Sequence, residues 1–246
     1  MGHRGPSDGP AAAATRGVSE RRTVALVPAS DEADLVGATV RALLSMTAVY
    51  EVVVVDDGSR DGTSAVALAA GAMVLRIPRR IGKGGALEGA LRRLPEPDVW
   101  LLADADLGES AASLVPVLEA VLADRADLAV AVLPPQAAGG LGTVRRFAAR
   151  AILLLTSFEA EQPLSGQRAV RGAALERCRP LAAGFGVETA MTIDALRAGL
   201  RVIEVPAPGL AHRATGRDVA GFTHRGRQGL DILRAVAARA LRRRRR

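Results

Sequence analysis

Residues Glu51–Val55 read EVVVV, and this run of four valines constrains the fold more than any other segment. A strand with one solvated face alternates apolar and polar residues, whereas an unbroken β-branched run is typical of a strand buried on both faces. Both faces of a sheet become covered when helices connect parallel strands in βαβ units. The run therefore predicts an α/β protein with a mostly parallel central sheet flanked by helices.

The rest of the chain repeats this alternation of short strands and helical patterns. Further strands are expected at Thr23–Val27, Ala72–Ile77, Asp98–Ala103, Asp127–Leu133, Gln167–Val170 and Arg201–Val205. Helices are expected at Glu32–Met46, Asp61–Ala70, Gly84–Leu94, Ser110–Ala123, Thr143–Phe158, Val187–Ala198 and Gly221–Leu241, with a loop at Pro134–Gly142. We expect a disordered lead-in over residues 1–22, one domain over residues 23–241 and a basic tail over residues 242–246.

Composition argues against several classes of protein. Cys178 is the only cysteine, so an internal disulfide is impossible and a cysteine-built metal centre is not expected. The longest uncharged apolar run, Ala151–Phe158, is far shorter than the roughly 20 residues of a membrane span. We see no leader pattern and expect a cytoplasmic protein. Aromatic residues make up only 2% of the chain, too few for a platform that stacks single-stranded nucleic acid.

The positive charge is a C-terminal feature. The formal net charge is +7, and residues 212–246 alone carry eleven arginines against Asp218 and Asp231. The tail Arg242–Arg246 follows a helical pattern and suits peripheral contact with the inner face of an anionic membrane; the alternative is a solvated tail. No recognition motif for nucleic acid accompanies the charge, so nucleic acid is not an expected partner. A homodimer is left open.

Polar side chains follow each of the first four predicted strands. Ligands of open α/β sheets bind beyond the carboxyl ends of the strands, so these residues are expected to share one site. Asp104 and Asp106 follow the fourth strand, separated by one residue. Paired carboxylates hold a hard divalent cation that keeps positions open for phosphate oxygens. The alternative is a helix cap ahead of Ser110.

Asp56 and Asp57 follow the EVVVV strand and are expected to accept hydrogen bonds from a base or a ribose hydroxyl. The sequence DGSRDG after the strand is also strong turn chemistry, and both interpretations can hold together. The segment Gly82–Gly85 contains Lys83 and opens a helix. Its glycines would let backbone amides approach a phosphate, while the lysine adds positive charge.

His212 and Arg217 follow the last predicted strand. A neutral imidazole at His212 would complete a metal shell begun by Asp106, although a lone histidine is also common on surfaces. Arg217, together with Arg213, would clamp a diphosphate through charge-assisted hydrogen bonds. The alternative for Arg217 is a surface ion pair with Asp218.

Four segments in this order, VALVPASDEA, EVVVVDDGSRDGT, IGKGGAL and LLADADL, resemble the nucleotide-sugar glycosyltransferases of family 2. They are also similar to two related groups, the glucosyl-3-phosphoglycerate synthases and the dolichyl-phosphate sugar synthases. The resemblance covers about residues 23–228 and implies a Rossmann-like A-type glycosyltransferase fold. It implies a nucleotide-binding half over residues 23–106 and an acceptor half over residues 107–241. The expected donor is a UDP-sugar, and the expected acceptor is a small molecule or a lipid phosphate.

The resemblance also implies roles for individual residues. Pro28, Ala29 and Glu32 would lie along the nucleotide, Asp57 with Asp56 would meet the base or ribose, and Lys83 would lie near the base and the diphosphate. Asp104 would contact the ribose or the donor sugar, and Asp106 with His212 would bind Mn²⁺ or Mg²⁺. The acceptor segments would include Ser165, Gly166, Gln167, Arg168 and Gly186. Glu188 would be the catalytic carboxylate, as acceptor base if the reaction inverts or as sugar ligand if it retains.

Two departures from the family pattern matter. Asp31 stands where the first motif usually has Asn, and the Q-x-x-R-W signature of processive synthases is absent, so a non-processive enzyme is expected. One alternative function is a catalytically degenerate module that binds a nucleotide sugar. The other is a nucleotidyltransferase, which usually carries a glycine- and arginine-rich loop where this chain has PASDE.

Overall fold

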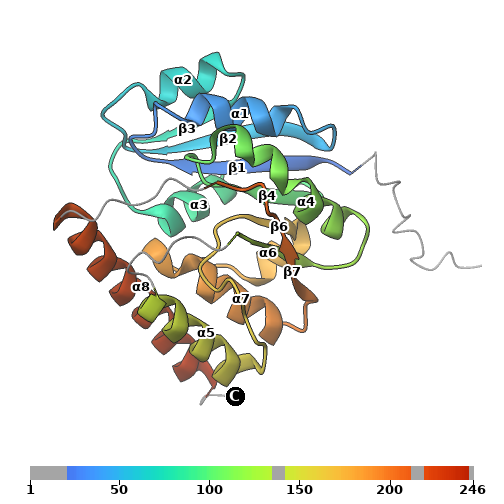
Figure 1. Cartoon of the computed structure of the whole chain (residues 1–246), viewed down its shortest axis with the longest axis vertical. Helices are drawn as coiled ribbons and strands as arrows, with labels where there is room; N and C mark the ends of the chain where they lie inside the picture. Colours follow the sequence, from blue (N-terminus) through green and yellow to red (C-terminus); the bar gives the residue numbers. More distant parts are fainter. Residues whose placement is uncertain (1–20, 135–141, 212–218, 244–246) are drawn as a thin grey trace, which may run out of the picture.

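The computed structural model describes residues 21–134, 142–211 and 219–243, with side chains in the last helix described for residues 229–241. These residues form a seven-stranded sheet with the strand order β3-β2-β1-β4-β6-β5-β7 (Figure 1). The strands are β1 (Thr23–Ala29), β2 (Val49–Asp57), β3 (Met73–Ile77), β4 (Val99–Leu102), β5 (Leu128–Val132), β6 (Arg168–Arg171) and β7 (Val202–Pro206). The predicted α/β fold is confirmed.

The sheet is parallel except at β6. Strand β1 pairs in parallel with β2 and β4, β2 with β3, and β5 with β7. Strand β6 lies antiparallel between β4 and β5, and its first residue, Arg168, pairs with Leu102 at the end of β4. The segment ahead of β6 therefore meets the carboxyl ends of its neighbours.

Helices cover both faces of the sheet, as the valine run requires. Val52 and Val54 face one core and Val53 and Val55 the other, and all four are 1% exposed or less. The first core packs against α1 (Val36–Leu44), α2 (Thr63–Ala69), the 3₁₀ helix η2 (Gly108–Leu114) and α4 (Val115–Leu122). The second packs against α3 (Lys83–Leu91), α6 (Gly172–Arg177) and α7 (Val187–Arg197).

Two further helices lie outside α7. Helices α5 (Gly142–Thr156) and α8 (Val219–Arg243) contact α7 and each other, and lie together at the end of the molecule away from α1 and α2 (Figure 1). Over the described residues, no helix combines the length and the apolar character that a membrane span needs.

The structure differs from the predicted elements in three places. The helix expected at Ser110–Ala123 is divided into η2 and α4, with Pro116 in the first turn of α4, where its missing N–H is tolerated. Helix α6 has only six residues and was not expected, because so short a segment has no clear period. Strands β1 and β2 extend to Ala29 and Asp57, so these residues end strands rather than follow them.

Candidate active site

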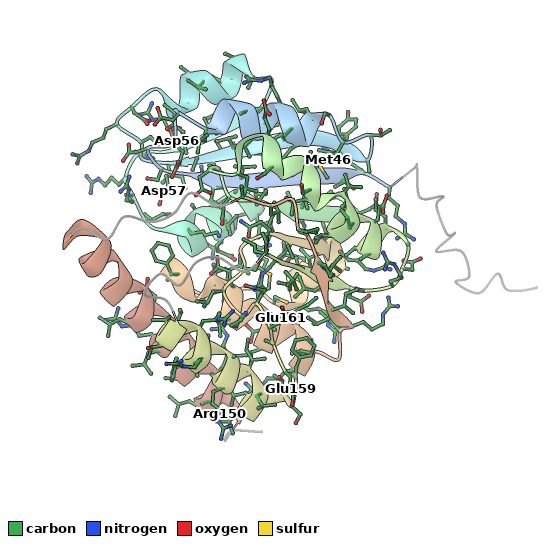
Figure 2. All side chains as sticks on the ribbon, viewed as in Figure 1. Met46, Asp56, Asp57, Arg150, Glu159 and Glu161 are labelled. Atoms are coloured by element: carbon green, nitrogen blue, oxygen red, sulfur yellow. The ribbon has the colours of Figure 1, made fainter. Side chains whose placement is uncertain are left out.

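The carboxyl ends of β1, β2 and β4 and the beginning of β6 meet at one edge of the sheet. The register places Ala29 beside Asp56 and Leu102 beside Arg168. Asp56 and Asp57 lie at the opposite end of the sheet from Met46, which precedes β2 (Figure 2). The sequence therefore brings its predicted site segments together at a single edge, as parallel strands require.

The two aspartates at the end of β2 organise the loops beside them. Asp56 accepts hydrogen bonds from the Ser59 N–H at 2.8 Å and from the Ser64 hydroxyl. Burial raises the pKa of Asp56, but these hydrogen bonds outweigh burial and hold it below its ordinary value. Asp57 accepts the N–H groups of Ile81 at 2.8 Å and Gly82 at 2.7 Å. The turn interpretation therefore describes their contacts in this structure.

The segment after β1 is anchored to the loop after β2. The Asp31 N–H donates to the Ser59 hydroxyl at 2.9 Å, and the Asp31 carboxylate accepts the Arg60 N–H at 2.7 Å. Asp31 adopts a φ of 59°, which asparagine and aspartate tolerate better than most side chains. The Glu32 N–H donates to the Thr63 hydroxyl at 2.9 Å. These contacts fix the backbone at the start of the site.

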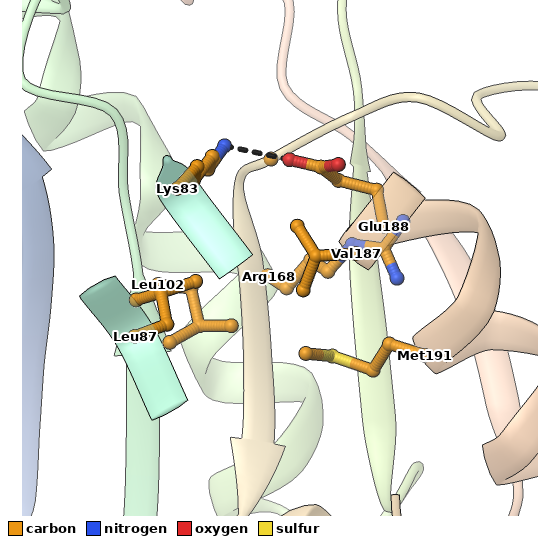
Figure 3. Close-up of a pocket in the computed structure, with 8 residues that line it drawn as sticks. Lys83, Leu87, Leu102, Arg168, Val187, Glu188 and Met191 are labelled. Atoms are coloured by element: carbon orange, nitrogen blue, oxygen red, sulfur yellow. Dashed lines mark ion pairs between the residues drawn. The ribbon is translucent and has the colours of Figure 1, made fainter. Parts of the chain in front are cut away.

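Lys83 joins two acids that are far apart in the sequence. Its Nζ lies 2.5 Å from Oδ1 of Asp104, just after β4, and 2.7 Å from Oε1 of Glu188, in the first turn of α7 (Figure 3). Burial lowers the pKa of Lys83, but the two carboxylates outweigh burial and raise it above its ordinary value. The cation is therefore held at the junction of the two predicted halves.

The buried segment Ser165–Gln167 packs against this ion pair and supports it. The Gln167 amide donates to Oδ2 of Asp104 at 2.7 Å, while the Ser165 hydroxyl donates to the Gln167 Oε1 at 3.2 Å. A Cβ on Gly166 would lie 2.3 Å from the Lys83 Nζ and 2.9 Å from both Asp104 carboxylate oxygens. Only glycine lets this backbone approach the charged pair so closely.

Arg168 links this segment to α7. It is 1% exposed, and it donates from Nε to the Ser165 carbonyl at 2.8 Å and from Nη1 to the Thr192 hydroxyl at 2.9 Å. Thr192 in turn donates to the Glu188 carbonyl at 3.1 Å. Burial lowers the pKa of Arg168 to about 10, although Glu188 partly opposes this. Arg168 also lines a small pocket under the Lys83–Glu188 ion pair (Figure 3).

The start of α7 is fixed by helix α8. The 3₁₀ turn η3 (Gly184–Gly186) leads directly into α7, and the Phe185 N–H donates to Asp231 of α8 at 3.3 Å. A Cβ on Gly184 would lie 2.0 Å from Oδ2 of Asp231, and one on Gly186 would lie 2.6 Å from the Ala235 Cβ. The two glycines let α8 pack against the turn that positions Glu188.

Comparison with known proteins decides the family. The model of the family described as glycosyl transferase family 2 matches residues 24–171, which include the carboxyl ends of β1, β2 and β4 and the whole of β6. The chain belongs to glycosyltransferase family 2. The sequence resemblance is thereby confirmed.

Two curated proteins similar to this chain are glucosyl-3-phosphoglycerate synthases. The synthase of Mycolicibacterium paratuberculosis is 32% identical over 208 residues, which are 74% of this chain and 63% of the relative. That of Mycolicibacterium smegmatis is 32% identical over 195 residues, 70% of this chain and 64% of the relative. The chain thus spans a little under two thirds of the length of both relatives.

Solved structures of the Mycobacterium tuberculosis synthase share the fold. One, in complex with Mn²⁺, uridine diphosphate and glucosyl-3-phosphoglycerate, is 28% identical with a TM-score of 0.75, covering 90% of this chain and 80% of that chain. Another, in complex with Mg²⁺ and uridine diphosphate, is 27% identical with the same TM-score and coverage. The A-type glycosyltransferase fold expected from the sequence is confirmed.

The metal site predicted for this family-2 chain rests on Asp106. Asp104 and Asp106 are partly buried beyond β4, and the turn between them is fixed because Thr39 donates to the Ala105 carbonyl at 2.8 Å and accepts the Gly108 N–H at 2.8 Å. Across the described ranges, no group of three or more His, Cys, Asp or Glu side chains gathers as a metal site. Both oxygens of Asp104 accept bonds from Lys83 and Gln167, so Asp106 is the carboxylate that fits a hard cation whose remaining ligands come from phosphate and water.

The other predicted site residues are placed as follows. Pro28 is half-buried and Ala29 is 3% exposed at the end of β1, while Gly186 is buried at the start of α7. The predictions for His212 and Arg217 lie outside the residues that the structure describes.

Sequence reasoning missed the threonines that hold this family-2 site together. Thr39 on α1, Thr63 on α2 and Thr192 on α7 each bond a backbone or side chain of a site segment. All three are 2% exposed or less. A polar residue on the buried face of a predicted helix is the one signal that would have indicated them.

Proposed function

We propose that the protein is a metal-dependent, non-processive glycosyltransferase that moves a hexosyl group from a nucleoside-diphosphate sugar, with UDP as the favoured nucleotide. The acceptor is a small molecule or a lipid phosphate. The observation that carries the proposal is the Lys83 ammonium between Asp104 and Glu188 in a family-2 fold. The relatives that bind uridine diphosphate with Mn²⁺ or Mg²⁺ support the choice of donor.

The donor nucleotide is proposed to lie along the ends of β1 and β2. Pro28, Ala29 and Glu32 would contact it from one strand end and Asp56 and Asp57 from the next. Because Asp57 already binds the backbone of residues 81 and 82, its main contribution is to shape the loop beside the base. Arg217 stays a proposed ligand of the diphosphate.

Asp106 is proposed to bind Mn²⁺ or Mg²⁺, with His212 as a second protein ligand. A bound divalent cation would neutralise the negative charge that develops on the departing nucleoside diphosphate. Asp104 would orient the ribose or the donor sugar, since its carboxylate is fixed by Lys83 and Gln167.

Lys83 is proposed to aim Glu188 at the sugar, because its ammonium lies 2.7 Å from Oε1 of that carboxylate. From there Glu188 would accept the acceptor hydroxyl proton in an inverting reaction or bind the donor sugar in a retaining one. The anomeric configuration of the first product, followed by NMR, distinguishes the two.

The segment Ser165–Arg168 is proposed to position rather than to bind the acceptor directly. All four residues are buried, and Gln167 donates to Asp104, while Arg168 directs Nε and Nη1 at the Ser165 carbonyl and Thr192. This changes the emphasis of the sequence prediction, in which these residues were acceptor ligands. Gly186, at the start of α7, stays a proposed acceptor contact.

Thermal unfolding with UDP, GDP, dTDP, CDP and ADP, each with and without Mn²⁺, tests the donor assignment. A ligand at 100-fold over its Kd stabilises by about 2.7 kcal/mol. For a chain of this size, the unfolding midpoint should rise by roughly 5–10 °C. If no nucleotide shifts the midpoint, the protein has no site for a nucleotide donor. That result would count against the degenerate binding module as well, and it would overturn the proposal.

Turnover tests the metal assignment. We expect removal of the metal by EDTA, or the substitution Asp106→Ala, to abolish sugar transfer from the nucleotide sugar that gives the largest thermal shift. A well-folded protein that binds nucleotide but transfers no sugar to any acceptor, and does not hydrolyse the donor, would identify the degenerate module. Substantial activity in Asp106→Ala would overturn the metal assignment.

We also propose that the protein is cytoplasmic and that the basic tail Arg242–Arg246 contacts anionic membrane. Residues 244–246 lie outside the described part of the chain, so this proposal rests on charge alone. Co-sedimentation with anionic liposomes should weaken in a chain ending at Leu241. Equal pelleting of the two chains would reject a role for the tail.

A further inference from the structure

Exposed apolar side chains gather on the two outermost helices. Eleven large apolar residues are exposed among those described, and five of them lie on α5 and α8. They are Phe147, Leu154, Leu230, Leu233 and Leu241. Leu154 is 62% exposed and Leu241 is 63% exposed. Single exposed leucines are ordinary, but a gathering on neighbouring helices indicates an interaction surface.

Both helices turn these residues away from the core. Helix α5 buries Ala148, Ala151 and Ile152 at helical spacing, and α8 buries Ile232 and Ala235 in the same way. Helices α5 and α8 contact each other, both pack on α7, and they lie together at one end of the molecule (Figure 1). We call the five exposed apolar residues and the arginines between them the α5–α8 surface.

Positive charge predominates on this surface. Arg145, Arg146 and Arg150 are exposed on α5, which carries no acid over its fifteen residues. Arg150 lies at the end of the molecule away from Asp56 and Asp57 (Figure 2). On α8, Arg234 has a side chain that is 78% exposed, and its Nη1 lies 3.9 Å from Oδ1 of Asp231, which also accepts the Phe185 N–H. The nearest acids along the chain, Glu159 and Glu161, follow the end of α5.

This combination favours a lipid surface over a second copy of the chain. A two-fold contact through α5 would bring Arg145, Arg146 and Arg150 of both copies close together, and α5 carries no acid to balance them. An anionic bilayer supplies phosphate groups for the arginines and an apolar layer for leucine and phenylalanine side chains. We propose that the α5–α8 surface docks the protein on anionic membrane, with the apolar side chains inserted at the level of the headgroups.

The surface is distinct from the basic tail and is connected to the site. Helix α8 also contacts the η3 turn through Asp231, so a docked protein would hold its acceptor half next to the bilayer. The proposal concerns binding alone, so it can succeed or fail whatever the donor and acceptor prove to be.

Vesicle binding by the full chain tests the proposal. The vesicles are phosphatidylcholine alone or phosphatidylcholine mixed with phosphatidylglycerol. The test variant is Arg145→Glu/Arg146→Glu/Arg150→Glu on α5, which leaves the basic tail intact. The matched control is Arg41→Glu/Arg93→Glu/Arg125→Glu, at exposed positions on other elements. Both variants carry the same change in net charge.

We expect the wild type and the control to bind anionic vesicles and the α5 variant to bind at least about tenfold more weakly. A second variant, Leu154→Ser/Leu230→Ser/Leu233→Ser, should also bind more weakly in low salt, because it removes the apolar contact. Equal losses in the α5 variant and the control would overturn the proposal, because net charge alone would explain the binding. So would a dimer that the α5 variant dissociates while vesicle binding is unchanged.

Discussion

At the scale of single residues, Lys83 decides how the site is arranged. The family resemblance implies a place near the base and the diphosphate, and in the structure its ammonium lies between Asp104 and Glu188. The reason is electrostatic: two carboxylates in a partly buried site repel unless a cation lies between them. Because Lys83 is the only lysine in the chain, its chemistry can be followed without interference from others.

The raised pKa of Lys83 predicts slow reaction with amine reagents. Its folded pKa lies above the ordinary value of 10.5, so its contribution to stability is complete below pH 10.5 and is lost as pH rises through the higher folded value. Acylation near pH 9, followed by mass spectrometry, should be much slower in the native protein than in urea. The α-amino group serves as the internal reference. Equal rates for Lys83 in both states would contradict the ion pairs.

Removing the ammonium should destabilise the fold. In Lys83→Met, Asp104 and Glu188 lose their counter-charge, and we expect a loss of about 1–3 kcal/mol in the free energy of unfolding, below the range for a fully buried pair. Because Glu188 is 8% exposed in its side chain, Lys83→Met/Glu188→Gln should recover part of this loss. Urea unfolding of the two single variants and the double variant measures the coupling. Additive losses would indicate that the two side chains do not interact.

At the scale of elements, the start of α3 is packed more tightly than its middle. A Cβ on Gly84 would lie 1.9 Å from the Ala182 carbonyl oxygen, whereas a Cβ on Gly89 of the same helix meets nothing within 4 Å. The backbone of residues 182–184 therefore lies directly against the helix. This contact is what aligns Lys83 with the segment leading to Glu188.

Two alanine substitutions on α3 should have opposite effects. Gly84→Ala forces the Ala182 backbone to move, and we expect it to cost about 1–3 kcal/mol of stability. Gly89→Ala should stabilise by roughly 0.5–1 kcal/mol, because alanine favours a helix interior. Urea unfolding measures both changes. A neutral Gly84→Ala would show that the two segments are not in contact.

The sequence predicted most elements and the identity of the strand ends, because buried strands and amphipathic helices have distinct periods. It failed where a residue acts through a neighbour that is distant in sequence. Nothing in the local pattern around Arg168 indicates that it binds Thr192, since that contact depends on how α7 packs against the sheet. The same holds for Thr39 and the turn after β4.

At the scale of the whole molecule, acid should unfold the protein through a distributed set of carboxylates. Hydrogen bonds hold the pKa of Asp56 low against its burial, and Arg179 does the same for Glu88. A hydrogen bond from Arg201 lowers the pKa of Asp127. A lowered folded pKa contributes stability that is complete above the unfolded value and is lost as pH falls through the folded one.

We therefore expect the free energy of unfolding to be nearly constant from about pH 8 to 5 and to fall steeply below about pH 4. Urea unfolding across this range tests the expectation. Asp56→Ala should flatten this decline in the free energy of unfolding, because the variant lacks the Asp56 carboxylate whose protonation contributes to it. A wild-type protein whose stability increases below pH 4 would contradict the assigned hydrogen bonds.

The reversed direction of β6 has a consequence for where this architecture tolerates change. Since its first residue pairs with the last residue of β4, Ser165–Gln167 ahead of the strand meet the site, and the chain beyond Arg171 emerges at the remote edge. A single insertion before Arg168 therefore displaces the support under Asp104, whereas an exposed insertion at the remote edge leaves that support in place. A fluorescent tag or an affinity peptide belongs at the remote edge.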